Sequence, residues 1–120
     1  GYQAMFDNTT GNHNVTVGQC TLHSNTTGEN NVAIGNRVLI ANTTASNNTA
    51  IGRCSLISNT TGCENTAIGN LALATQTTAI RNTAVGQAAL KNTAGSTNSA
   101  LGYNALCGNT TGGSNGIFIT

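Results

Sequence analysis

Asn65-Thr66-Ala67-Ile68-Gly69 is the stretch from which the fold can be predicted, because near-copies of it recur at a fixed interval. Asn48-Thr49-Ala50-Ile51-Gly52 lies 17 residues upstream, and Asn82-Thr83-Ala84-Val85-Gly86 lies 17 residues downstream. The closing glycines form a series with steps of 17 and a final step of 16: Gly1, Gly18, Gly35, Gly52, Gly69, Gly86 and Gly102. A short fixed period is typical of a solenoid, in which each coil contacts only its neighbours. We therefore predict a stack of coils rather than a globular domain.

The repeat divides the chain into seven coils with the pattern G-x-x-A-L-x-x-N-T-T-G-x-x-N-T-A-I, in which the glycine is position one. The coils are residues 1–17, 18–34, 35–51, 52–68, 69–85, 86–101 and 102–120. Coil six is one residue short, and the spacing places the gap just before Asn92. Because the chain starts on a repeat boundary with Gly1 rather than Met, we expect residues 1–120 to be one solenoid segment of a longer protein.

Two residue types dominate the composition, since 19 Asn and 21 Thr make up one third of the chain. Asn, Thr and Gly are poor helix formers. We therefore predict an all-β fold, a parallel β-roll or β-helix with about 17 residues per coil and room for two short strands and two turns. Rungs of β-structure stack ~4.8 Å apart, so seven coils predict a rod of roughly 34 Å.

Charge and hydropathy exclude several classes of partner. Charged residues make up 6% of the chain and the formal net charge is +1, which provides no electrostatic surface for nucleic acid or an anionic membrane. No apolar run approaches the ~18 residues of a transmembrane helix, and no secretory signal is visible. We therefore predict no nucleic-acid partner and no membrane insertion.

Two columns of large apolar residues recur once per coil and predict the core. Position five holds Met5, Leu22, Leu39, Leu56, Leu73, Leu90 and Leu106. Position seventeen holds Val17, Ile34, Ile51, Ile68, Val85 and Leu101. Because the remaining positions are mostly small or polar, both columns are expected to point into the coil.

The alanines at position sixteen predict a contact surface. Neighbouring residues of a strand face opposite sides, so if Ile68 points inward, Ala67 must point outward. An outward column of small apolar residues suggests another chain packed closely against it, and we predict self-association, most simply as a homotrimer. The alternative is that alanine merely tolerates exposure. The column is Ala33, Ala50, Ala67, Ala84 and Ala100.

Position fourteen is Asn in every coil and predicts a polar ladder. Identical amides one rung apart can donate and accept hydrogen bonds along the stack. The column is Asn14, Asn31, Asn48, Asn65, Asn82, Asn98 and Asn115. We interpret this column as structural rather than catalytic or ligand-binding.

Residues that could carry chemistry are few and do not repeat in register. The acids occupy different positions of the coil, so a carboxylate pair for acid–base catalysis is not expected. His13 and His23 have no partner at ligand spacing, and no nucleophile–base set can be assembled. Cys20 and Cys54 lie two rungs apart, ~9.6 Å by the stacking distance, which exceeds the ~7 Å limit for a disulfide. We predict no enzyme, no metal, no cofactor and four free thiols.

Glycosylation is a further possibility, because N-x-S/T sequons mark surface turns in glycosylated chains. The candidates in the Asn-Thr-Thr turn are Asn8, Asn25, Asn42, Asn59 and Asn109. Asn14 and Asn47 also satisfy the sequon. In a chain this rich in Asn and Thr, sequons also arise by chance and by duplication of the repeat.

The motif N-T-A-I-G-x-x-A-L from Asn65 to Leu73, with N-T-T-G from Asn59 to Gly62, resembles the short head repeats of trimeric autotransporter adhesins. It is also similar to repeats of phage tail fibres and of algal-virus surface glycoproteins. The resemblance covers the whole chain and implies a left-handed parallel β-roll, assembled as a homotrimer, that attaches to host surfaces, matrix or glycans. The common adhesin repeat is shorter than 17 residues, and the last coil departs from the motif with Asn115-Gly116-Ile117-Phe118-Ile119.

Three functions are consistent with these observations. The first is a non-enzymatic fibrous attachment module, a trimeric rod on a virion or cell surface whose partner is a host-surface glycan or protein receptor. Free thiols fit assembly inside a reducing cell, which favours a viral or phage fibre over a bacterial adhesin. The second is a structural filament or capsid component without a receptor. The third is an ice-binding solenoid, although adjacent Thr9 and Thr10 would face opposite sides rather than form one flat array.

Overall fold

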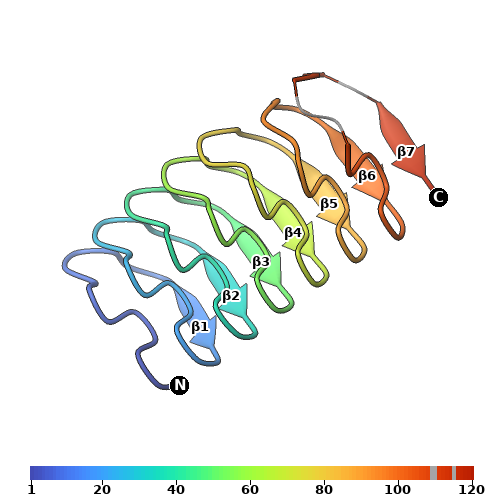
Figure 1. Cartoon of the computed structure of the whole chain (residues 1–120). Helices are drawn as coiled ribbons and strands as arrows, with labels where there is room; N and C mark the ends of the chain where they lie inside the picture. The colour runs from blue at the N-terminus through green and yellow to red at the C-terminus, as the bar shows by residue number, and fades with distance from the viewer. Residues whose placement is uncertain (109–110, 115) are drawn as a thin grey trace.

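The computed structural model, which describes residues 1–108, 111–114 and 116–120, shows a parallel β-solenoid with one short strand per coil (Figure 1). The strands pair in sequence order within a single sheet. They are β1 (Val15–Val17), β2 (Val32–Ile34), β3 (Thr49–Ile51), β4 (Thr66–Ile68), β5 (Thr83–Val85), β6 (Ser99–Leu101) and β7 (Ile117–Ile119). The molecule measures 37 × 20 × 18 Å, so its length agrees with the rod that the repeat predicts. None of the described residues belongs to a helix long and apolar enough to cross a membrane.

The strands keep the register of the repeat almost to the end of the rod. Ala50 pairs with Ala67, and Ile51 pairs with Ile68. At the last step Ala100 pairs with Phe118, so β7 begins one residue later than the 17-residue period predicts. Phe118 thereby takes the place of the inward alanine, and 44% of its surface stays exposed at the end of the rod.

The prediction of two strands per coil is wrong, because the side of the coil opposite the sheet is built from turns. Positions three and five have positive φ in every coil, for example 59° at Cys54 and 48° at Leu56. Such left-handed residues do not fit a strand and cost about 1–2 kcal/mol each for a residue with a Cβ. The rungs are nevertheless hydrogen-bonded there, since Leu56 N–H donates to Ala72 O at 3.0 Å.

The leucine column at position five is confirmed as the core. Leu22, Leu39, Leu56, Leu73 and Leu90 have no exposed surface. Met5 and Leu106, near the two ends of the rod, are partly buried against this cluster. Burying a leucine stabilises the fold by about 1.5–3 kcal/mol, which offsets the cost of its left-handed backbone.

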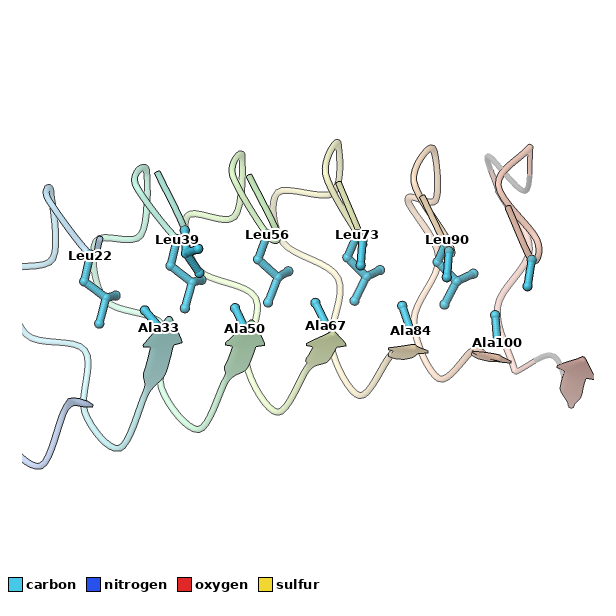
Figure 2. Close-up of a cluster of buried hydrophobic side chains, with 14 residues drawn as sticks. Leu22, Ala33, Leu39, Ala50, Leu56, Ala67, Leu73, Ala84, Leu90 and Ala100 are labelled. Carbon is cyan, nitrogen blue, oxygen red and sulfur yellow. The ribbon is translucent and has the colours of Figure 1, made fainter. Parts of the chain in front are cut away.

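The second predicted core column is wrong, because the strands face the other way. The alanines at position sixteen are 0–3% exposed, and Figure 2 shows them opposite the leucines across the interior of the coil. Val17, Ile34, Ile51, Ile68, Val85 and Leu101 therefore point outward and are exposed or half-exposed. The interior opposite the leucines is therefore occupied mainly by the alanine methyl groups, and the larger Thr16 and Phe118 take the same position only in the first and last strands, where they are not fully buried. The same observation excludes Ala33, Ala50, Ala67, Ala84 and Ala100 as an oligomer face.

The glycine at position one lets the chain turn out of the strand close to the next rung. At Gly52 φ is +119°, and an added Cβ would lie 2.7 Å from the carbonyl carbon of Gly69. Both the conformation and the contact require glycine. The glycine series is therefore a consequence of rung-to-rung backbone contact.

Replacing Leu56 with Asp should unfold the rod, because a buried, unpaired carboxylate costs several kcal/mol. The measurement is thermal unfolding of the variant followed by circular dichroism. Thr61, which is exposed at a turn, offers a matched control, and Thr61→Asp should unfold at nearly the parent temperature. Equal stability of Leu56→Asp and the parent protein would show that the leucine column is not the core.

Candidate functional site

The candidate functional surface is the outer sheet face, defined as positions fifteen and seventeen of β1–β6. It presents a valine, threonine or serine at the first position and a valine, isoleucine or leucine at the second. Val15 is 50% exposed, Val17 56% and Leu101 46%. This stripe of mainly β-branched side chains runs the length of the sheet. Sequence reasoning identified the second column but placed it inside the coil, and it did not single out the first.

A shallow hollow interrupts the outer sheet face at β5 and β6. It has a volume of about 270 Å³ and is lined by Thr83, Val85, Ser99, Ala100 and Leu101. Its lining carries no charged group and no cluster of convergent polar side chains. The hollow is therefore suited to an apolar side chain of another molecule rather than to a polar substrate.

The predicted Asn ladder at position fourteen is confirmed for the described residues, but its amides bond mainly to backbone. Asn48 N–H donates to Asn31 Oδ1 at 3.0 Å, and Asn48 Nδ2 donates to Gly62 O on the next rung at 2.9 Å. The same pattern starts at Asn14, whose Nδ2 donates to Gly28 O at 2.8 Å. Asn115 lies outside the described residues. Each amide thus joins two rungs, so the column is structural.

A second ladder, at position eight, was missed by sequence reasoning. Asn42 Nδ2 donates to Asn25 Oδ1 at 2.8 Å and to Ala45 O at 3.1 Å, while Asn42 Oδ1 accepts from Asn59 Nδ2 at 3.1 Å. These are direct amide–amide bonds, repeated from rung to rung. The recurrence of an amide at position eight was the available signal, but the sequons at those residues pointed to the surface.

The second ladder corrects the prediction of glycosylation. Asn25, Asn42 and Asn59 are fully buried, so their amide nitrogens cannot reach a glycosyltransferase in the folded chain. Asn8 is half-buried, and its Nδ2 donates to Gly11 O at 3.0 Å. Asn109 lies outside the described residues.

Coil six breaks the second ladder. Gln76 Nε2 still donates to Asn59 Oδ1 at 2.7 Å, but Gln76 Oε1 and Thr93 Oγ1 are buried and have no hydrogen-bond partner among the described residues. Thr93 N–H donates to Leu90 O at 3.2 Å, as Asn59 N–H does to Leu56 O. Thr93 therefore occupies position eight, so the missing residue falls after Thr93 and not before Asn92. The hydroxyl is too short to continue the amide ladder.

The titratable residues do not assemble a catalytic site within the described part of the chain. His23 Nδ1 lies 3.6 Å from Asp7 Oδ2, and the His23 ring stacks on Phe6 with centroids 5.4 Å apart. No three His, Cys, Asp or Glu side chains among the described residues are grouped to hold a metal ion. The four cysteines are free thiols, of which only Cys54 is buried.

Comparison with protein-family models, with curated proteins and with solved structures finds no match to this chain.

Replacing Asn42 with Ala should destabilise the rod by about 1–3 kcal/mol, because it removes the donor to the buried Oδ1 of Asn25 and one of the two acceptors of Asn59 Nδ2, which keeps only Gly62 O. Thr44 is exposed on the same turn, and Thr44→Ala should change the stability by less than about 0.5 kcal/mol. Chemical denaturation followed by circular dichroism measures both. If the Asn42→Ala variant is as stable as Thr44→Ala, the second ladder does not stabilise the rod.

Proposed function

We propose that this chain is a non-enzymatic fibrous attachment module: a rigid rod that assembles as a homotrimer and presents or spaces host-binding surface on a virion or cell. The observation that carries the proposal is the outer sheet face. Soluble monomers rarely expose large contiguous apolar patches, and here one valine, isoleucine or leucine per rung is exposed or half-exposed on this face from Val17 to Leu101.

A second copy of the chain is the occupant that best matches this stripe. Its side chains repeat at the rung spacing, so a parallel copy in register places the same side chain against each rung. Closed cyclic assemblies use such self-complementary repetition, and three rods around one axis would bury all three faces. The resemblance to the heads of trimeric adhesins supports the same stoichiometry.

The rod and that resemblance support the proposed surface localisation and attachment. A stack of coils keeps one direction over its whole length, so it holds apart the structures at its two ends. The exposed turns outside the sheet can vary in sequence without changing the stack, and a receptor would bind to them. This role requires no catalytic group, metal or cofactor.

The mass of the protein in solution should be that of a trimer, with or without a reducing agent, because the interface is apolar and the four thiols are not bridged. Multi-angle light scattering gives this mass directly. A stable monomer under both conditions would contradict the proposed assembly.

A charged pair of variants separates assembly from folding. Ile51→Asp combined with Ile68→Asp should yield a folded monomer, since both side chains point away from the coil and a carboxylate there is tolerated only when the face stays in water. Thr44→Asp combined with Thr61→Asp, on exposed turns, should remain a trimer. If the Ile51→Asp/Ile68→Asp variant remains a trimer, the interface lies on another surface of the rod.

A second candidate function is ice binding, and the orientation of the strands favours it. Thr49, Thr66 and Thr83 each stand two residues before an Ile or Val on the outer sheet face. Hydroxyls and methyl groups are thereby arrayed at rung spacing on one side of a regular sheet, and such arrays can order water. This array differs from the adjacent Thr pair considered from the sequence.

Ice binding predicts thermal hysteresis by the purified monomer. Thr66→Tyr should abolish the hysteresis because the ring breaks the array, whereas Thr61→Tyr at the turn should leave it unchanged. Nanolitre osmometry measures the freezing-point difference. No hysteresis from the parent protein would exclude this function.

A further inference from the structure

One corner of the rod carries a planar polar side chain at almost every rung. The corner column is position two of the coil and follows the glycine at which the chain leaves the sheet. Its residues are Tyr2, Gln19, Asn36, Arg53, Asn70, Gln87 and Tyr103. All are exposed or half-exposed, and Tyr2 and Tyr103, at the two ends, are 70% and 66% exposed.

The backbone holds this column in strict register. Arg37 N–H donates to Gln19 O at 2.9 Å, Cys54 N–H to Asn36 O at 3.0 Å, and Leu71 N–H to Arg53 O at 3.1 Å. The same bond from position three to position two of the preceding rung recurs from Cys20 to Asn104. The side chains of the column therefore leave the rod at successive rungs, ~4.8 Å apart.

Two arginines lie on adjacent rungs in the middle of this corner, at neighbouring positions of the coil. Arg53 belongs to the column, and Arg37 follows Asn36 on the preceding rung. Both are exposed, and neither makes an ion pair or side-chain hydrogen bond within the described residues, whereas Arg81 Nε lies 3.0 Å from Glu64 Oε2. The corner thus has two uncompensated guanidinium groups beside amides that are only partly hydrogen-bonded. Asn36 Nδ2 donates to Gln19 Oε1 at 3.1 Å and Asn70 Nδ2 donates to Arg53 O at 3.2 Å, while each Asn keeps its Oδ1 and a second N–H for a ligand.

These groups match the chemistry of an acidic sugar chain. A guanidinium binds a carboxylate through two parallel hydrogen bonds. Side-chain amides both donate and accept, as do sugar hydroxyls. An exposed tyrosine offers an apolar ring face together with a hydroxyl group. A nucleic acid fits less well, because two arginines in a chain with a formal net charge of +1 cannot neutralise a continuous phosphate backbone.

We propose that the corner column binds a linear acidic polysaccharide lying along the rod, with a uronate carboxylate on Arg37 and Arg53 and neighbouring sugar hydroxyls on Asn36 and Asn70. The inference names the ligand class of the proposed attachment module and rests on that function. It uses a surface other than the outer sheet face, so binding and assembly can be measured separately.

The test is titration of the protein with size-fractionated oligogalacturonate, measured by calorimetry at low ionic strength. Arg37→Gln with Arg53→Gln should weaken binding about tenfold or more, because charge-assisted hydrogen bonds are lost. Arg81→Gln is the matched control, since it removes one positive charge at another corner, and it should bind like the parent. Asn36→Ala with Asn70→Ala should weaken binding several-fold while all charges remain.

The proposal would be overturned if oligogalacturonate does not bind, or if neutral maltohexaose binds equally well. It would also be overturned if Arg81→Gln loses as much affinity as Arg37→Gln/Arg53→Gln, or if Asn36→Ala/Asn70→Ala binds as tightly as the parent. Full competition by inorganic sulfate at the same concentration as the oligosaccharide would reduce the site to one for small anions and would also overturn it. Melting temperatures of the variants confirm that they are folded. Light scattering on the same samples keeps the two proposals distinct, because a trimer without binding defeats only the ligand, and a monomer that binds defeats only the assembly.

Discussion

The backbone hydrogen bond between successive rungs, from one position of the coil to the position before it on a neighbouring rung, is the interaction on which the structure depends. Leu56 N–H donates to Ala72 O, and Gly52 N–H to Ile34 O. Because these bonds repeat at one spacing, each coil must place the same backbone group in the same place, and a side chain that enters the narrow space between rungs is excluded. The glycines at position one follow directly, as the close approach of Gly69 to Gly52 shows.

The interior is thin, and polar ladders supplement it. A coil buries one leucine against one alanine of the strand, in several coils with an apolar residue of position four such as Val38 or Ala72 beside them, which is little apolar area for 17 residues. Two columns of amides compensate by hydrogen bonding across rungs, as Asn42 and Asn48 do. A buried amide without a partner is costly, so the ladders tolerate few interruptions. Coil six shows such an interruption, where Thr93 cannot reach the amide of Gln76.

The inward-facing and outward-facing positions of the rod therefore accept different residue types. Inward columns repeat nearly unchanged because every rung offers the same space, whereas the corners carry Tyr, Arg, Gln, Glu and His without affecting the stack. Our proposals divide along the same line: the outer sheet face is regular and apolar, as suits another copy of the rod, and the corner column is polar and irregular, as suits a ligand. A coil of this design can change its specificity at one corner residue and keep its fold.

The sequence alone determined the period, the all-β solenoid, the leucine core and the Asn ladder at position fourteen, because each is visible as one residue type recurring at one spacing. It could not decide which of two adjacent columns, Ala67 or Ile68, faces inward, since alternation along a strand is satisfied by either phase. Nor could it show that the side-chain amides of Asn25, Asn42 and Asn59 are buried rather than exposed for glycosylation. Only the tertiary structure decided these points, because the face of a strand that is buried depends on the residues packed opposite it, here the leucines of position five.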